Sequence, residues 1–89
     1  MSEWDSPIRR QPGVIGEQVE QEAVLLLPEV GSVIVLNEVG RVIWELIDGQ
    51  RNPAALVAAL VDQYEVTPDV AQADVQAFLA DLRVCGAIR

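Results

Sequence analysis

The side chains that most often carry out catalysis are scarce in this chain of 89 residues. It has no histidine, so the usual general base near neutral pH is missing. Its single cysteine, Cys85, has no histidine partner and falls on a helix face that we expect to be buried, which favours a core thiol over a nucleophile. We therefore expect no catalysis by this chain alone and no cofactor.

The carboxylates are numerous but dispersed. Asp62, Asp69, Asp74 and Asp81 are spread along predicted helices, without the close spacing of a cation-binding loop. A zinc site of cysteine and histidine ligands cannot be built from one cysteine, and no glycine-rich phosphate loop is present. The sequence predicts no metal site and no nucleotide site.

Charge and composition narrow the class of partner. Fourteen acidic residues against six basic ones give a net charge of −8, which repels nucleic acid and anionic lipid headgroups. No apolar run approaches the ~18 residues of a membrane span, and the N-terminus does not read as a secretory signal. A single cysteine suits a reducing compartment. We expect one cytoplasmic domain that binds neither nucleic acid nor membrane.

A short run of β-branched residues organises the first half of the chain. Residues 32–36 read Ser-Val-Ile-Val-Leu, a strand suited to a half-buried pleated surface. Two further strands are predicted at residues 14–20 and 23–27, and Pro28 and Gly31 mark the turn before the last one. Tight links of this kind favour an antiparallel meander whose third strand has an open edge.

The second half changes to helical periodicity and carries clear start signals. Asn37, Asn52-Pro53 and Thr67-Pro68 are typical N-caps, and Gly49 and Gly86 are typical helix ends. Trp44 falls on the flank of the first helix, which favours the edge of the core over a contact site. The apolar faces of the first two helices comprise Val39, Val42, Ile43, Leu46 and Ile47, then Leu56, Val57, Leu60, Val61 and Tyr64.

The third helix, predicted over residues 68–85, has two apolar strips. One is assigned to the core: Ala71, Val75, Phe78, Leu79, Leu82 and Cys85. The other has small side chains and is bordered by Asp74 and Asp81: Val70, Ala73, Ala77, Ala80 and Val84. Alanines on a helix surface can reflect helix propensity alone. Beside an open strand they can also let another backbone approach, and the sequence leaves both interpretations open.

Three strands followed by three helices predict an α+β domain with a winged helix-turn-helix-like architecture. DNA-binding versions place basic and amide side chains on the later helix, whereas this one has one arginine, two glutamines and three aspartates. An open strand beside a helix is instead suited to a peptide. A winged-helix DNA-binding regulator and a structural subunit of an enzyme complex remain alternatives.

Residues 1–13 lack periodicity and predict a flexible N-terminal tail, with the folded domain spanning residues 14–89. Trp4 and the Arg9-Arg10 pair are open to two interpretations, a solvated tail or a contact with a partner.

The ordered motifs of residues 14–88 resemble the PqqD-like family. They are Val24–Leu36 with its Pro28-Glu29 turn, Leu36-Asn37 opening a helix, Ile43-Trp44-Glu45-Leu46-Ile47-Asp48-Gly49, Pro53–Leu60, and Phe78-Leu79-Ala80-Asp81-Leu82 before Gly86. The resemblance implies a recognition element for ribosomally synthesised, modified peptides (RiPPs), which binds the leader of a precursor peptide as an added strand. The residues after Tyr64 look most like the free-standing leader-binding proteins of lasso-peptide clusters.

The resemblance also implies partners and a site. The partners are a precursor peptide and a processing enzyme, either a cysteine leader peptidase or, as the alternative, a radical-SAM enzyme. The leader lies along the third strand and in the cleft towards the third helix. Combined with the choice of helix face above, this predicts peptide-binding residues Val30, Ser32, Val33, Ile34, Val35, Leu36, Val70, Ala73, Asp74, Ala77, Phe78 and Asp81.

Overall fold

The computed structural model describes residues 6–88, which form a three-stranded sheet followed by three helices. The elements are β1 (Ile15–Val19), β2 (Glu22–Leu27), β3 (Ser32–Leu36), α1 (Glu38–Leu46), α2 (Pro53–Gln63) and α3 (Pro68–Cys85). The sheet is antiparallel, in the order β1-β2-β3. The α+β, winged-helix-like architecture is therefore confirmed. Trp4 lies outside the described residues.

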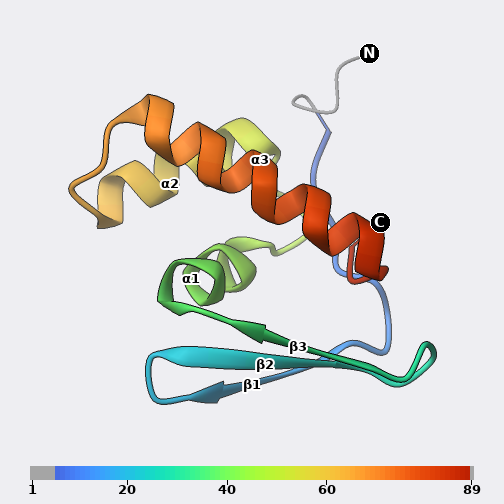
Figure 1. Cartoon of the computed structure of the whole chain (residues 1–89). Coiled ribbons are helices and arrows are strands. Elements are labelled where there is room, and N and C mark those ends of the chain that lie inside the picture. The colour runs from blue at the N-terminus through green and yellow to red at the C-terminus, as the bar shows by residue number, and fades with distance from the viewer. Residues whose placement is uncertain (1–5, 89) are drawn as a thin grey trace.

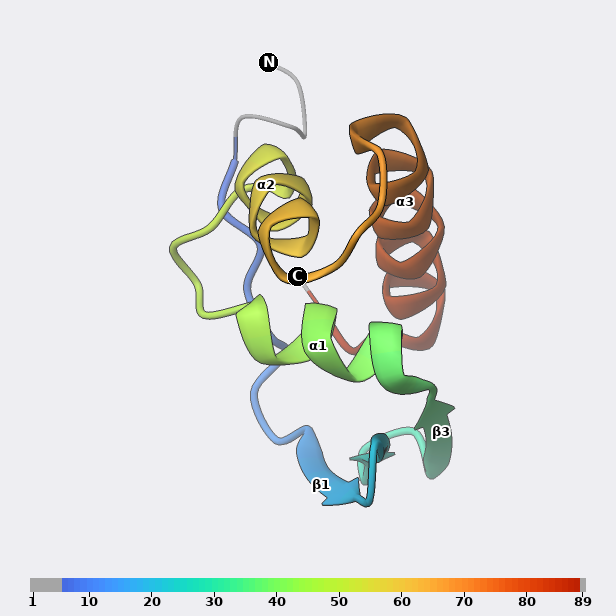
Figure 2. The same cartoon turned by 90° about the vertical axis from the view of Figure 1, so that its left-hand side faces the viewer.

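The elements stack in layers on one face of the sheet. Figures 1 and 2 show α1 lying across the sheet, with α2 and α3 beyond it. In Figure 2, α3 lies on the side of β3, and α2 lies on the side of β1. β2 contributes Ala23, Leu25 and Leu27 to the core, all on its face turned towards the helices. Burial at every second residue of β2 is the strand periodicity of a sheet covered on one side.

The helix boundaries follow the local chemistry of the caps. The side-chain oxygen of Asn37 accepts a hydrogen bond from the Gly40 amide at 2.9 Å, and that of Asn52 from the Ala55 amide at 2.8 Å. The Thr67 hydroxyl accepts from the Val70 amide at 3.3 Å. Gly86 ends α3 with φ +82°, a left-handed conformation that glycine adopts without strain. All three predicted starts and the final stop are thus confirmed, whereas α1 ends at Leu46 with Ile47 as its C-cap and not at Gly49.

The core is aliphatic, with Trp44 at its edge. Trp44 is 5% exposed, which confirms its predicted place, and Phe78 and Cys85 are half-buried against the same cluster. The helix residues that are fully buried include Val42, Ile43, Ile47, Leu56, Leu60, Ala71, Val75, Leu79 and Leu82.

The prediction of a flexible tail over residues 1–13 is wrong for its described part, residues 6–13. Ile8 is only 2% exposed, and its amide donates to the Arg51 carbonyl at 2.9 Å. The Gln11 amide donates to the Ala87 carbonyl at 2.8 Å, and Arg10 forms a β-bridge with Ile88. One buried isoleucine and pairing with the end of the chain hold this segment in place. A single apolar residue among polar ones gives no periodic signal in the sequence.

Candidate functional site: a groove along the free edge of β3

The outer edge of β3 is unpaired. In the sheet order β1-β2-β3, β3 pairs only with β2, and no other strand within residues 6–88 joins it. Its side chains alternate: Leu36 is buried on the helix side, whereas Val33 and Val35 are 64% and 67% exposed on the opposite side. The backbone groups on an unpaired edge are available to another extended chain.

A groove runs between this edge and α3, and it consists of two adjoining cavities. The first is about 180 Å³ and lies beside β3. The second is about 260 Å³ and lies towards the start of α1. The first cavity is lined by Ile34, Val35, Leu36, Asn37, Gly40, Phe78, Asp81, Leu82 and Cys85. The second is lined by Asn37, Val39, Gly40, Ile43, Asp74, Phe78 and Asp81.

The close approach of α1 to α3 depends on Gly40. A Cβ atom on Gly40 would lie 3.2 Å from Cε1 of Phe78, 3.3 Å from Oδ1 of Asn37 and 3.4 Å from Cβ of Leu36. The missing side chain therefore lets the Phe78 ring settle against the first turn of α1. Glycine early in a helix has low helix propensity, and a tight packing contact of this kind is a common reason for it.

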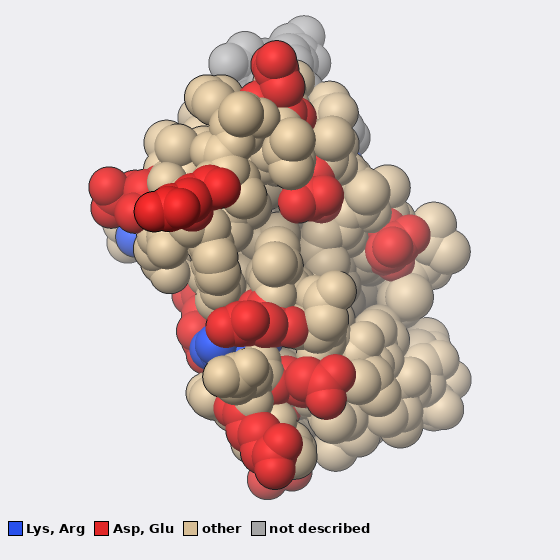
Figure 3. Space-filling model, turned by 60° about the vertical axis from the view of Figure 1, so that its left-hand side comes forward, with Lys and Arg blue, Asp and Glu red and all other residues tan. Residues whose placement is uncertain are grey.

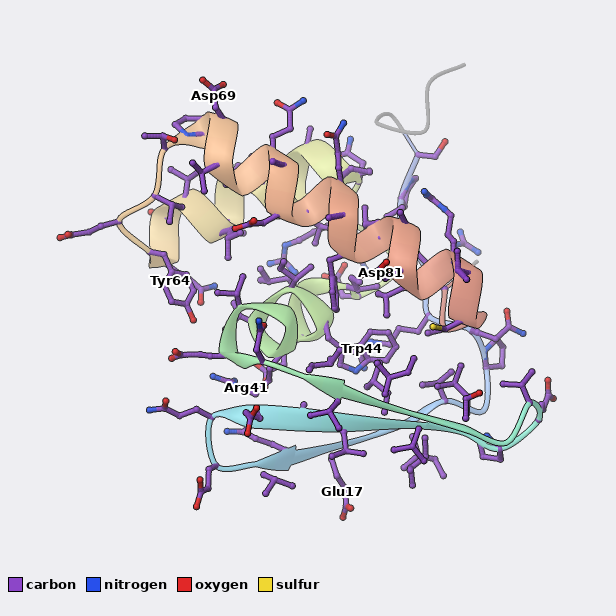
Figure 4. The ribbon with its side chains drawn as sticks, in the orientation of Figure 1. Glu17, Arg41, Trp44, Tyr64, Asp69 and Asp81 are labelled. Carbon is purple, nitrogen blue, oxygen red and sulfur yellow. The ribbon has the colours of Figure 1, made fainter. Side chains whose placement is uncertain are left out.

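The structure brings together half of the predicted site residues. Ile34, Val35 and Leu36 line the groove with Asp74, Phe78 and Asp81. Figure 4 shows Asp81 on the side of α3 nearer the sheet, whereas Asp69 points away from it. The peptide-binding role of these residues remains a prediction.

The other predicted site residues lie around the groove and not in the linings of its two cavities. Val30 is exposed in the turn before β3, and Ser32 and Val33 begin the strand. Val70, Ala73 and Ala77 are on the exposed surface of α3. At 100° per residue they are rotated about 80°, 140° and 100° away from Phe78. Their part in binding also remains a prediction.

Sequence reasoning did not identify six of the lining residues: Asn37, Val39, Gly40, Ile43, Leu82 and Cys85. Val39 and Ile43 were assigned only to the apolar face of the first helix. Asn37 was interpreted only as a cap, and Leu82 and Cys85 only as core. The glycine within the first turn of α1 was the available signal for a close approach.

The groove combines an apolar floor with acidic groups. Its floor includes Leu36, Phe78 and Leu82, and its two carboxylates are Asp74 and Asp81. Neither cavity lining contains an arginine. Acidic side chains are also scattered over the face turned forward in Figure 3, with few basic ones between them. This surface suits an extended chain with apolar side chains and positive charge.

Among the described residues, the two groups with shifted pKa values lie outside the groove. Backbone amides of Gln50 and Arg51 donate to the Asp48 carboxylate and lower its pKa. Partial burial lowers the pKa of Arg10, whose guanidinium lies over the Trp44 ring. Within residues 6–88, no three histidine, cysteine or carboxylate side chains are placed to hold a metal ion. No helix of the described chain has the length and apolarity to cross a membrane.

The meander, the three capped helices and the groove at the sheet edge define the class of PqqD-like recognition domains. Residues 22–88 match the family model for coenzyme PQQ synthesis protein D, and the chain belongs to the PqqD family. It is 40% identical over 63 residues to PqqA binding protein 1 of Pseudomonas putida and to the PqqA binding protein of Pseudomonas entomophila. These matches cover 71% of this chain and 66%, just under two thirds, of each relative's length.

Solved structures share the fold almost throughout. TbiB1 in complex with the TbiA(beta) leader peptide superposes with a TM-score of 0.83 at 26% identity, covering 91% of this chain and 94% of that one. Lasso peptide synthetase B1 complexed with the leader peptide gives 0.82 at 25% identity, covering 94% and 99%. The PqqD part of Methylobacterium extorquens PqqCD, a stand-alone RiPP recognition element, gives 0.76 at 25% identity, covering 92% and 87%.

Proposed function

We propose that this protein captures the leader of a ribosomally synthesised precursor peptide by strand addition. The leader pairs antiparallel with the free edge of β3 and lies in the groove under α3. The observation that carries this proposal is the unpaired β3 edge, which forms one wall of a groove whose other wall is the Phe78 side of α3. Two of the structural relatives are described as complexes with leader peptides, which supports the same role here.

Backbone pairing and side-chain burial contribute differently to peptide recognition. The five residues of β3 offer main-chain groups to any extended peptide, so pairing alone gives affinity with little selectivity. The cavities beside the strand select among peptides, because each takes a side chain of limited size and charge. A dissociation constant near 1 μM corresponds to about −8 kcal/mol, an ordinary value for an interface of this kind.

We further propose that the captured leader belongs to a lasso-peptide precursor and that this protein delivers it to a leader peptidase. Delivery needs a second surface, and the face of the sheet opposite the helices is available. Apolar side chains from all three strands lie on it, namely Ile15, Val19, Val24, Leu26, Val33 and Val35. Four of them are at least half exposed: Ile15, Val19, Val33 and Val35. Contiguous exposed apolar surface is typical of a protein–protein contact, and we assign this one to the processing enzyme.

The curated relatives favour one alternative. Both are named as PqqA binding proteins. This protein would then act as a peptide chaperone of the PqqD type that serves a radical-SAM enzyme. Peptide capture on β3 is the same in both cases, and only the enzyme that receives the peptide differs.

The test of peptide capture is fluorescence anisotropy with labelled leaders encoded in genes next to this one. A dissociation constant at or below the micromolar range is expected for one leader, with a scrambled version of the same peptide as control. No saturable binding by any neighbouring leader contradicts the proposal. A gel shift at low salt tests the DNA-binding alternative, and no retarded band is expected because the chain carries a net charge of −8.

The test of delivery separates the two surfaces. Val19→Ser removes apolar surface from β1, across the sheet from β3. We expect it to leave leader affinity unchanged and to slow cleavage of the precursor by the peptidase from the same gene cluster. Unchanged cleavage contradicts the assignment of this face.

A further inference from the structure

The two cavities of the groove differ in chemistry although they share a wall. Asn37, Gly40, Phe78 and Asp81 line both. The cavity beside β3 adds the apolar Ile34, Leu36 and Leu82, together with Val35 and Cys85. The cavity towards α1 adds Val39, Ile43 and Asp74, so it contains both carboxylates of the groove.

The offset between the cavities matches the spacing of side chains on a strand. On α3, the cavity towards α1 is lined by residues 74, 78 and 81, and the cavity beside β3 by residues 78, 81, 82 and 85. The shift is about one helical turn, or ~5.4 Å. Successive side chains on one face of a strand are two residues and ~6.6 Å apart. Neighbouring same-face residues of one added strand can therefore enter the two cavities.

The direction of the guest strand follows from the position of α1. The cavity towards α1 lies beyond the C-terminal end of β3, because its lining begins at Asn37 and continues into α1. A guest strand antiparallel to β3 runs from that end towards Ser32. The side chain in the carboxylate cavity therefore precedes the one in the apolar cavity by two positions.

We propose that the groove selects leaders with lysine or arginine two positions before a large apolar residue. This inference rests on the proposed function and specifies the peptide that it recognises. The long basic side chain lays its methylene groups on Phe78 and Val39 and brings its charge to Asp74 and Asp81. The apolar residue fills the cavity beside β3, which has about 180 Å³ of free volume.

The first experiment selects ligands without assuming a leader. A displayed library of random 15-residue peptides is panned against the full-length protein at low salt. Enriched peptides are expected to share a basic residue two positions before Leu, Ile, Met, Phe or Tyr. Enrichment of apolar peptides without the basic position overturns this inference and leaves the proposed function intact. If no peptide is enriched, both fail.

The second experiment measures the charge contribution on the best enriched peptide. Asp74→Asn and Asp81→Asn are each expected to weaken binding about two- to fivefold at low salt, as partly exposed ion pairs do, and less at 0.5 M salt. Replacing the peptide's basic residue by norleucine removes both ion pairs, so it should weaken binding to the wild type by more than either variant does. The same replacement should weaken binding to each variant by a smaller factor, because one carboxylate remains.

The matched control is Asp69→Asn, which makes the same change in net charge on the same helix. Asp69 points away from the sheet (Figure 4). Its variant should bind the peptide as the wild type does. An equal loss in all three variants means that the protein's overall charge acts, and it overturns the inference. The inference is also overturned if the norleucine peptide loses the same affinity for the wild type as for both groove variants.

Discussion

The two edges of the sheet are both unpaired within residues 6–88, but different surfaces lie beside them. β1 is exposed along its whole length, and a cavity of about 220 Å³ lies between it and α1. That cavity is lined by Arg10, Arg41, Glu17 and Glu45, which balance in charge. Three of these side chains already have partners: Arg10 donates to the Trp44 carbonyl at 2.6 Å, and Arg41 pairs with Glu45 at 3.0 Å.

The β3 edge has a different opposite wall. There α3 provides Phe78, Leu82 and two carboxylates along a groove parallel to the strand. The contrast teaches that an unpaired backbone edge is not sufficient for a site. The helix that faces the edge decides whether a guest chain finds side-chain cavities or a surface occupied by the protein's own ion pairs.

Proline in β3 should produce the largest difference between the edges. Consecutive residues of a strand direct their amides to opposite sides, so Ile34→Pro and Val35→Pro each remove a different donor, one from the β2 ladder and one from the free edge. The variant that loses the free-edge donor should unfold cooperatively like the wild type and bind the leader more than about tenfold more weakly. Thermal unfolding and anisotropy measure the two effects.

The matched control for these variants is a pair of proline substitutions in β1, Glu17→Pro and Gln18→Pro. One of the two removes an amide donor from the β2 ladder and the other removes one from the free edge of β1. The folded member of that pair should keep full leader affinity. Equal losses from proline at both edges would mean that the leader does not distinguish β3 from β1, and the contrast drawn above would be wrong.

A pair of glycines offers a second and smaller test. Gly40→Ala places its Cβ against Phe78 on the β3 side, and Gly16→Ala places its Cβ 3.1 Å from Nε1 of Trp44 on the β1 side. We expect Gly40→Ala to shift Phe78 into the groove and weaken leader binding about three- to tenfold. Its stability should change little, because the gain in helix propensity of about 1 kcal/mol offsets the crowding.

Gly16→Ala crowds the core edge without touching the groove. It should lower the free energy of unfolding by about 1 to 2 kcal/mol while leaving leader affinity within twofold of the wild type. Denaturant unfolding and anisotropy on both variants check this pattern. Weaker binding by Gly16→Ala, with Gly40→Ala unaffected, contradicts it.

The N-terminal segment contributes Arg10 to the cavity between β1 and α1. The Arg10 guanidinium lies 4.5 Å from the centroid of the Trp44 ring and donates to its carbonyl. Arg10→Ala should therefore lower the free energy of unfolding by about 1 to 2 kcal/mol. Leader affinity should not change. The control is Arg9→Ala, an exposed neighbour with the same loss of charge, which should leave the free energy of unfolding almost unchanged. If both variants are equally destabilised, the loss of net charge is the cause and not the contact with Trp44.

Local chemistry made much of the fold predictable from the sequence. The N-cap signal lies within four residues, because one side-chain oxygen accepts a hydrogen bond from the amide three residues later. This holds for Asn37, Asn52 and Thr67. The alternating burial of β2 and the apolar face of α3 are likewise local patterns. The packing of Ile8 and the contact of Gly40 with Phe78 depend on segments far apart in sequence. For this reason the docked N-terminus and the exact groove face of α3 were not predictable.

The smallest expected effect lies in the loop between α1 and α2, away from both edges. The Asp48 carboxylate accepts from the amides of Gln50 and Arg51 at 2.9 and 3.1 Å and pairs with the Arg51 guanidinium at 2.9 Å. These contacts lower its pKa in the folded state, with the backbone amides as the largest cause. The stabilisation is therefore fully present above the pKa of the unfolded chain and is lost as the pH falls through the lower, folded-state value.

Asp48→Asn should accordingly reduce stability slightly at pH 7 and by less as the pH falls below the ordinary range of an aspartate. Denaturant unfolding of the wild type and the variant across pH 2.5–7 measures the difference. Leader affinity at pH 7 should be the same for both proteins, because the loop contributes no residue to the linings of the β3 groove. A stability difference that grows towards low pH would mean that the carboxylate is not held by these amides in its charged form.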